Sequence, residues 1–311
     1  MKYLIVGGTG LCGGHIAVLL RNLGHEVVLM SRNTPDPGSL LARMPHWACD
    51  YTSPYFETGR LGEFDGMVFA AGNDLRHFAR SGESDMTAFF RVFNEEAIPR
   101  FFSIAKSSGI PRAVYLGTFY PRVAPAAVQG DSYLKSRVIA DQLVRKLNDG
   151  DFMVCSCDLP FVIGDIYGAS SRYLEVLIKY AQGKRGDLPL FAPPGGSNFM
   201  SCQSMAEAVC GALAWGKGGR AYLVGDENLT WKAFLELWFR AANNLIELDV
   251  RWESHPLFPD ELMYAGVGAT ISYEPSAEDR ENLCYSVGSL RPTVARMVKS
   301  STWSDRQSAV L

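Results

Sequence analysis

The chain has 311 residues and a mass of 34.2 kDa, which is about the length of two average domains. Hydrophobic residues make up 47% and charged residues 20%, a composition typical of folded globular proteins that excludes a disordered chain. Thirty basic and 33 acidic residues leave a net charge of -3, which argues against a nucleic-acid binder or a basic membrane-surface protein. No apolar run reaches the ~20 residues that cross a bilayer.

The N-terminus and the cysteines indicate a cytoplasmic protein. An apolar strand pattern at residues 3–6 leads directly into glycines, whereas a secretory signal needs a longer apolar stretch. The seven cysteines show no C-x-x-C spacing, and their odd number disfavours a complete disulfide framework, so we expect free thiols, with Cys155 and Cys157 buried in one strand. The five histidines lack the spacing of metal ligands, and we therefore expect no metal.

Apolar runs alternate with helical patterns along the first half of the chain. The expected strands cover residues 3–6, 27–30, 67–70, 113–116, 153–159 and 221–224, with a further strand before Cys49. The first helix has an apolar stripe and then Gly24, which suits a left-handed C-cap; the stripe consists of Ile16, Leu19, Leu20 and Leu23. Further helices are expected at 95–108, kinked or starting at Pro99, and at about 133–148.

This alternation predicts an α/β fold with a doubly wound parallel sheet of the Rossmann type. It becomes less regular after Gly164, where turns and aromatic helices take over. We assign residues 1–165 and about 199–225 to the Rossmann domain. Residues of about 166–198 and 226–311 are assigned to a second, smaller mixed α/β lobe that binds the substrate.

A glycine-rich stretch, Gly7-Gly8-Thr9-Gly10-Leu11-Cys12-Gly13, separates the first strand from the first helix. Glycines permit a tight turn and close backbone approach, and the helix N-terminus offers N–H groups and a positive dipole end to a phosphate. A turn that needs glycine only for its dihedral angles is the alternative. We expect pyrophosphate binding by six residues of this loop: Gly7, Thr9, Gly10, Leu11, Cys12 and Gly13.

The residues after the second strand discriminate between NAD and NADP. A carboxylate there binds the ribose 2′-hydroxyl of NAD and repels the 2′-phosphate of NADP. This chain instead has Ser31 and Arg32, with no carboxylate before Asp36. Since a guanidinium can bind phosphate through two hydrogen bonds, the sequence predicts that NADP(H) is preferred over NAD(H). An ordinary surface arginine is the alternative interpretation.

Several short motifs follow the other expected strands: Cys49-Asp50-Tyr51, Phe69-Ala70-Ala71-Gly72, Leu116-Gly117-Thr118, Tyr133-Leu134-Lys135-Ser136-Arg137 and Leu159-Pro160-Phe161-Val162-Ile163-Gly164, together with Asn94. With these motifs, residues of about 1–225 resemble the extended or atypical short-chain dehydrogenase/reductase family, in its epimerase/dehydratase-like branch. The resemblance implies that the cofactor is lined by Asp50, Tyr51, Ala70, Ala71 and Gly72. It also implies that Pro160 and Val162 lie near the nicotinamide carboxamide.

The catalytic signature of that family is Tyr-x-x-x-Lys with an upstream Ser or Thr. A cation one helical turn after the tyrosine lowers the pKa of the phenol, and the hydroxyl polarises the substrate oxygen. Tyr133 and Arg137 occupy the expected helix, with arginine in place of lysine, and Thr118 is the candidate hydroxyl. Because arginine never deprotonates, it leaves the charge in place but cannot pass on a proton. A second match, Tyr180 with Lys184, lies after the sixth strand and is interpreted as structural.

The substrate pocket is expected beyond the carboxyl ends of the strands, lined by Phe119, Tyr120, Phe161 and Phe199. The alternative is that Phe199, with Trp231, Phe234 and Trp238, belongs to the core. Phe119 and Tyr120 also stand where dehydratases of the family carry an Asp-Glu pair, which disfavours dehydration. The sequence thus favours an NADP(H)-dependent carbonyl reductase or alcohol dehydrogenase for a small lipophilic or aromatic ketone, aldehyde or alcohol.

Two other functions remain open. One is an NAD-dependent sugar-nucleotide epimerase, although Asp158 stands where those enzymes often carry an arginine. The other is a non-catalytic NADP-sensing or binding protein, which the arginine at position 137 invites. For partners, we expect a small-molecule substrate, no nucleic acid and no membrane. By analogy with similar proteins, we expect a homodimer formed through two helices.

Overall fold

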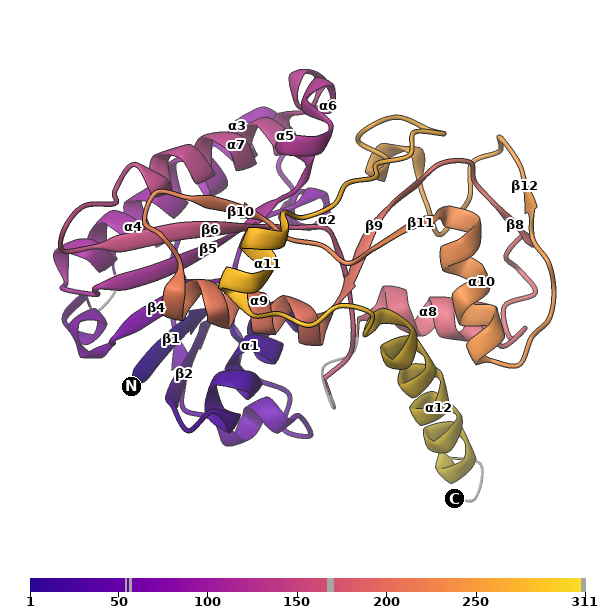
Figure 1. Ribbon diagram of the computed structural model, residues 1–311, viewed down its shortest axis with the longest axis horizontal. Coiled ribbons are helices and arrows are strands. Elements are labelled where there is room, and N and C mark those ends of the chain that lie inside the picture. Colours follow the sequence, from indigo (N-terminus) through magenta and orange to yellow (C-terminus); the bar gives the residue numbers. More distant parts are fainter. Residues whose placement is uncertain (54, 56–57, 167–170, 309–311) are drawn as a thin grey trace.

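Seven parallel strands form the central sheet of the computed structural model, which describes residues 1–53, 55, 58–166 and 171–308 (Figure 1). The strands are β1 (Lys2–Val6), β2 (Glu26–Ser31), β3 (His46–Ala48), β4 (Gly66–Phe69), β5 (Arg112–Thr118), β6 (Met153–Leu159) and β10 (Ala221–Leu223). Their order is β10-β6-β5-β4-β1-β2-β3, so the topology reverses between β1 and β4. The predicted doubly wound Rossmann sheet is confirmed, and this reversal is where such sheets bind nucleotides.

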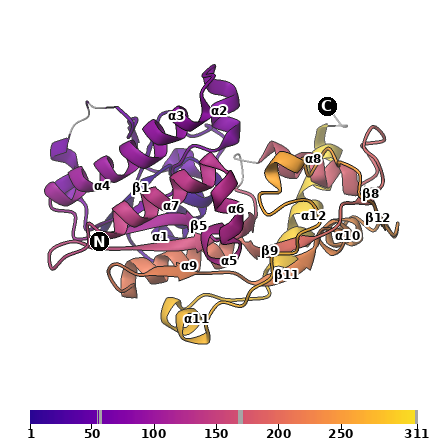
Figure 2. The ribbon, with the colours of Figure 1, turned by 90° about the horizontal axis from the view of Figure 1, so that it is seen from above.

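Helices cover both faces of the sheet, which explains why its strands are continuously apolar (Figures 1 and 2). On one face, α1 (Leu11–Asn22) and α9 (Cys202–Trp215) pack together, with α11 (Ala277–Leu283) against α9. On the other face lie α4 (Ala97–Ser107) and α7 (Ser132–Arg145). Cys155 and Cys157 are buried free thiols facing α9, as predicted. Gly24 follows α1 with a φ of +85°, which confirms the left-handed C-cap.

The helix before β5 is longer than expected and is irregular at a different point. After α2 (Leu75–Ser81) and α3 (Met86–Phe90), a π-helical turn at Arg91–Glu96 runs directly into α4. The predicted kink or start at Pro99 is therefore corrected: the irregular turn lies at residues 91–96, and α4 starts at Ala97. Such π turns are common at functional sites, and this one places Asn94 in the interior, fully buried.

A second set of elements forms the smaller lobe beside the sheet (Figure 1). A three-stranded sheet contains β7 (Phe161–Ile163), β9 (Gly196–Ser201) and β11 (Glu227–Thr230), and β8 (Phe191–Ala192) pairs with β12 (Asp249–Val250). Around these sheets lie the helices α8 (Arg172–Ala181), α10 (Trp231–Ala241) and α12 (Leu290–Ser308). Trp231, Phe234 and Trp238 are buried, which confirms that this helix supplies the core. The predicted domain boundaries stay a prediction.

Short helices make the remaining connections. Two α-helical segments follow β5, namely α5 (Tyr120–Val123) and α6 (Pro125–Gly130). The 3-10 turns are η1 (Leu40–Arg43), η2 (Thr58–Glu63) and η4 (Asp260–Leu262). Among the described helices, none combines the length and the apolar character needed to span a bilayer.

Candidate active site

The glycine loop forms a tight cradle between β1 and α1. Gly7 has a φ of +79°, and its N–H donates to the Met30 carbonyl at 2.8 Å. A Cβ on Gly13 would lie only 2.4 Å from the Gly7 carbonyl oxygen, so glycine is required for the close approach of helix and turn. Gly10 caps α1 without a side-chain hydrogen bond, and no acidic residue lies in the first turn. The N–H groups of this turn are thus available to an anion such as a pyrophosphate.

The remaining loop residues surround these amides. Thr9, Leu11 and Cys12 are half-buried. Burial raises the pKa of the Cys12 thiol to about 11, and the charge of Arg76 opposes this rise only in part. Cys12 is therefore a neutral side chain at neutral pH, and it adds no negative charge that would repel a phosphate.

The ends of β2 and β3 lie at the expected adenosine side of the loop. The Ser31 hydroxyl donates to the Asn33 carbonyl at 2.9 Å and contacts His46 Nε2 at 2.9 Å. Arg32 is exposed, and the described residues give it no hydrogen bond or ion pair. The Asp50 carboxylate accepts hydrogen bonds from the amide and the hydroxyl of Thr52. Of these groups, only the guanidinium of Arg32 is free to bind an anionic ligand.

The side chain of Tyr51, the residue after Asp50, lies in the core. The ring is 9% exposed and packs edge-to-face on Phe69 and Phe101 in the core. Its hydroxyl accepts a hydrogen bond from Asn73 at 3.0 Å. That Tyr51 lines the cofactor stays a prediction.

The segment that follows β4 joins the glycine loop to the predicted catalytic helix. A Cβ on Gly7 would meet the Ala71 nitrogen at 2.7 Å, so the ends of β1 and β4 touch. A Cβ on Gly72 would lie 2.5 Å from Arg137 Nη1. Ala70 and Ala71 are half-buried beside Gly72, as expected for small residues beneath a bound molecule. Because residue 72 is glycine, the Arg137 guanidinium can lie against the backbone at this point.

Arg137 is deeply buried for a charged residue, with 8% of its surface exposed. Its Nη2 donates to the Leu116 carbonyl at the end of β5, and its guanidinium lies 5.1 Å from the centre of the Tyr115 ring. Nε has no hydrogen-bond partner among the described residues. In the described part of the chain no carboxylate lies within hydrogen-bonding distance of this positive charge, so it remains available to a neighbouring group.

Tyr133 lies one helical turn before Arg137, with its ring 5.3 Å from that of Phe90 and 5.7 Å from that of Tyr264. Burial raises the pKa of the Tyr133 phenol, and the charge of Arg137 opposes this shift without outweighing it. Arg137 thus lowers the pKa of this phenol as predicted, but burial outweighs it, and the expectation of an acidic phenol is corrected. Tyr133 is protonated at neutral pH and can donate a proton.

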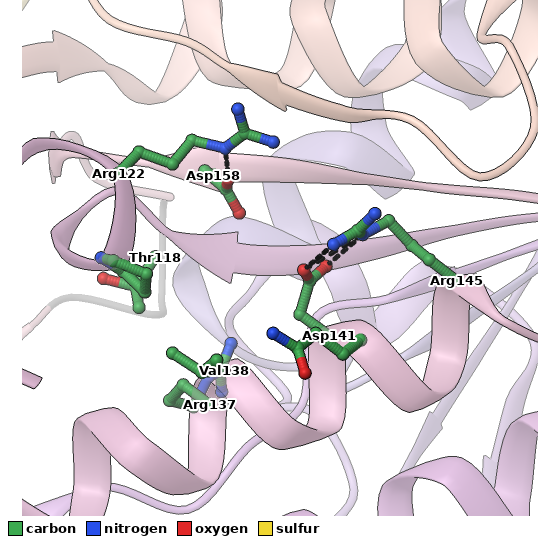
Figure 3. A pocket seen from close by; sticks show the side chains of 9 residues that line it. Thr118, Arg122, Arg137, Val138, Asp141, Arg145 and Asp158 are labelled. Atoms are coloured by element: carbon green, nitrogen blue, oxygen red, sulfur yellow. Dashed lines mark hydrogen bonds and ion pairs between the residues drawn. The ribbon is translucent and has the colours of Figure 1, made fainter. Parts of the chain in front are cut away.

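Thr118 ends β5 and lines a cavity of about 170 Å³ together with Arg137 (Figure 3). The other described residues around it are Pro121, Arg122, Val138, Asp141, Gln142, Arg145 and Asp158. Two ion pairs form its upper and right sides in Figure 3, Arg122 with Asp158 and Arg145 with Asp141. The structure therefore brings Thr118 and Arg137 to one cavity.

The predicted substrate residues divide into two groups. Phe119 and Tyr120 are buried beside Tyr133 in one apolar cluster, and Phe161 packs on it. Phe199 is 1% exposed and stacks on Phe234, with ring centres 4.3 Å apart. Its assignment to the substrate pocket is corrected, since it belongs to the core of the smaller lobe. Pro160 is buried and Val162 half-buried at the start of β7.

Several polar residues near Tyr133 were not found from the sequence. Asp74 caps α2 and holds Arg76 and His77 through its carboxylate. These hydrogen bonds lower the pKa of Asp74 although burial opposes them, so the carboxylate is ionised. Tyr264 was also not identified from the sequence, because it lies in an irregular segment without periodicity. A polar cluster directly after an Ala-Ala-Gly strand end was the available signal for Asp74.

Asn94 links the π turn to the catalytic helix. Its Nδ2 donates to the Asn73 carbonyl and to the Ser136 hydroxyl, both at 3.0 Å. Ser136 in turn donates to the Tyr133 carbonyl at 2.7 Å. This network fixes the first turn of α7, and thereby the position of the phenol.

The second Tyr-x-x-x-Lys match has a structural role, as expected. Tyr180 is 1% exposed, and its hydroxyl donates to the Pro189 carbonyl at 2.7 Å. Its helix α8 ends at Ala181, before Lys184. Tyr180 lies in the core of the smaller lobe and does not face the glycine loop.

Solved structures share this architecture over almost the whole chain. That of gox2253 is 18% identical and covers 94% of this chain and 96% of its own, with a TM-score of 0.75. UDP-N-acetylglucosamine 4-epimerase from Bacillus cereus is 17% identical, with coverages of 96% and 98% and a TM-score of 0.71. DesIV, a dTDP-glucose 4,6-dehydratase from Streptomyces venezuelae solved with NAD and TYD, is 17% identical, with coverages of 96% and 96% and a TM-score of 0.72. These TM-scores show the shared fold and no more.

The sequence itself matches no curated protein significantly. It does match the model of the NAD dependent epimerase/dehydratase family over residues 3–225, which include the glycine loop, the Tyr133 helix and all seven strands of the large sheet. The chain therefore belongs to the NAD dependent epimerase/dehydratase family.

Proposed function

We propose that this protein is an NADP(H)-dependent carbonyl reductase. The observation that carries the proposal is the pairing of a protonated Tyr133 with the buried charge of Arg137, one helical turn apart. A protonated phenol suits reduction, in which the alkoxide that forms needs a proton. Oxidation of an alcohol, the first half of epimerisation, needs a phenolate instead. The protonated form of Tyr133 is thus the one that reduction requires.

The residues present fit a dinucleotide. The close approach of Gly13 to Gly7 leaves the first-turn amides of α1 open to a diphosphate, and Arg137 lies beside Gly72 at the neighbouring strand end. When bound, the nicotinamide supplies a hydride to the carbonyl carbon. Thr118 holds the carbonyl oxygen through a hydrogen bond, Tyr133 donates its proton to that oxygen, and Arg137 stabilises the phenolate left behind. Neighbouring structures solved with NAD support the cofactor class.

The preference for NADP(H) rests on Arg32. Its guanidinium is exposed just after β2 and has no described partner, so it is free to bind a 2′-phosphate. Replacing Arg32 with glutamine removes that charge. We expect the Kd for NADPH to rise about tenfold or more while the Kd for NADH changes little. Equal effects on both coenzymes in a fluorescence titration contradict the proposed role of Arg32.

The substrate class follows from the side chains near Tyr133. Phe90 and Tyr264 pack on its ring. Tyr120 packs on Tyr264, and Phe119 packs on Tyr120. Aromatic walls gain most from apolar and aromatic ligands. We therefore propose a small lipophilic or aromatic ketone or aldehyde as the substrate.

Oxidation of NADPH in the presence of a panel of such carbonyl compounds tests the proposal. We expect turnover by the wild type and a loss of at least about 100-fold in Tyr133→Phe, within the range of general acid catalysis. Tyr180→Phe is the matched control and should retain activity, because Tyr180 is core. Unchanged turnover in Tyr133→Phe contradicts the assignment. Tight NADPH binding without any oxidation supports a sensor.

A sugar-nucleotide epimerase is the second candidate. The family match and the neighbouring epimerase structures favour it, and those structures align with the smaller lobe as well as the sheet. An epimerase must keep its coenzyme through a cycle of oxidation and reduction. Oxidised coenzyme that remains bound through dialysis, with conversion of a UDP-sugar, supports this candidate over the reductase.

A further inference from the structure

An ion pair behind Thr118 ties the end of β5 to its neighbours. Asp158 on β6 pairs in register with Gly117, the residue before Thr118. A Cβ on Gly117 would lie 2.2 Å from Asp158 Oδ1, so the carboxylate rests directly against the β5 backbone. Glycine at 117 is therefore required to admit the carboxylate at this point.

Arg122 holds the same carboxylate from the other end of the turn. It lies four residues after Thr118, in the short helix α5, and its Nε donates to Asp158 Oδ2 at 2.7 Å. Its Nη2 donates to the Ala221 carbonyl on β10 at 3.0 Å. The Phe119 amide donates to the Leu159 carbonyl at 3.2 Å. Both ends of the turn are thus hydrogen-bonded to β6, and its Arg122 end also to β10.

The pair is partly buried and sits in a charged environment. Asp158 is 5% exposed, whereas the side chain of Arg122 is 44% exposed. Burial and, to a lesser extent, the charge of Asp141 raise the pKa of Asp158 to about 7, although Arg122 and Arg145 lower it. Asp141 and Arg145 face it from α7, and Tyr273 neighbours it from the smaller lobe. Ionisation of Asp158 near neutral pH thus depends on Arg122.

We propose that the Arg122–Asp158 pair is a positioning device that holds the turn from Thr118 to Arg122 in the conformation needed for substrate binding. It fixes the Thr118 hydroxyl and, through the same turn, the rings of Phe119 and Tyr120. This inference rests on the proposed function of Thr118, but the geometry of the turn is independent of turnover. Figure 3 shows the pair on the opposite side of the cavity from α7.

Hydrogen–deuterium exchange of the amides of residues 119–123, measured with kcat, tests the proposal. In Asp158→Asn and Arg122→Met, we expect exchange to accelerate and kcat to fall, each about tenfold, with the Kd for NADPH unchanged. Arg240→Met is the matched control: it breaks an ion pair with Glu236 on the exposed side of α10, away from the cavity, and should leave exchange and kcat as in the wild type.

The pH dependence separates positioning from a general structural role. Because its pKa is raised to about 7, we expect Asp158 to be more ionised at pH 8 than at pH 6 and its pairing with Arg122 to be stronger, so wild-type protection of 119–123, corrected for intrinsic exchange, should be higher at pH 8. In Asp158→Asn this difference should disappear. Wild-type exchange in both variants overturns the inference even if Tyr133→Phe confirms the reductase. If no carbonyl compound is reduced, the proposed function fails and exchange alone decides the role of the pair.

Discussion

Gly72→Ala tests the dependence of the catalytic helix on the space that Gly72 leaves for Arg137. The added methyl carbon would lie 2.5 Å from Nη1, roughly 1 Å inside van der Waals contact. Arg137 cannot simply swing away, because it is buried, bonded to the Leu116 carbonyl and packed on Tyr115. Overpacking of this kind costs about 1–3 kcal/mol, so we expect the free energy of unfolding to fall by about 2 kcal/mol.

A double-mutant cycle isolates the contact. In the Arg137→Lys background no guanidinium fills the space, so the same Gly72→Ala change should cost less than about 0.5 kcal/mol, a coupling of about 1.5 kcal/mol. Urea unfolding of the four proteins measures these values, and Gly130→Ala is the control because a Cβ there meets nothing within 4 Å. An equal cost of Gly72→Ala in both backgrounds refutes the reasoning.

Two further predictions concern the glycine loop and the buried carboxylate. Gly13→Ala puts a methyl group 2.4 Å from the Gly7 carbonyl oxygen, a clash that only a backbone shift can relieve. We expect this change to weaken NADPH binding at least about tenfold in a fluorescence titration. An affinity equal to that of the control Gly130→Ala contradicts this prediction. Because the folded pKa of Asp158, about 7, lies above its unfolded value, the neutral carboxyl stabilises the fold below about pH 4 and this contribution is lost as pH rises to about 7. The free energy of unfolding of Asp158→Asn, measured with urea, should not show that decline between about pH 4 and pH 7. If the variant shows the same pH dependence as the wild type, the raised pKa of Asp158 is contradicted.

The large sheet could be predicted from the sequence because both of its faces are covered. A strand between two helical layers must be apolar throughout, and each run from residue 3 to residue 224 carries that pattern. The glycine loop and the Tyr133–Arg137 spacing are likewise local, since a tight turn and one helical turn each fix their geometry within a few residues. These features survived in the structure with shifts of a few residues at their ends.

What could not be predicted depends on contacts between distant segments. The raised pKa of Tyr133 arises from burial, to which Phe90 and Tyr264 contribute from distant parts of the chain. Asp158 and Arg122 are 36 residues apart, and no pattern in either segment announces their ion pair. Phe199 illustrates the limit differently: its strand, Gly196–Ser201, mixes polar and apolar residues although all six are buried, so composition could not separate a pocket wall from the core.

A structure of the protein crystallised with NADP⁺ tests the central claim most directly. We expect the diphosphate against the amides of residues 9–13, the 2′-phosphate beside Arg32, and the nicotinamide ribose within hydrogen-bonding distance of Tyr133 and Arg137. A coenzyme bound elsewhere, or a nicotinamide ring on the far side of the sheet edge from Tyr133, contradicts the claim.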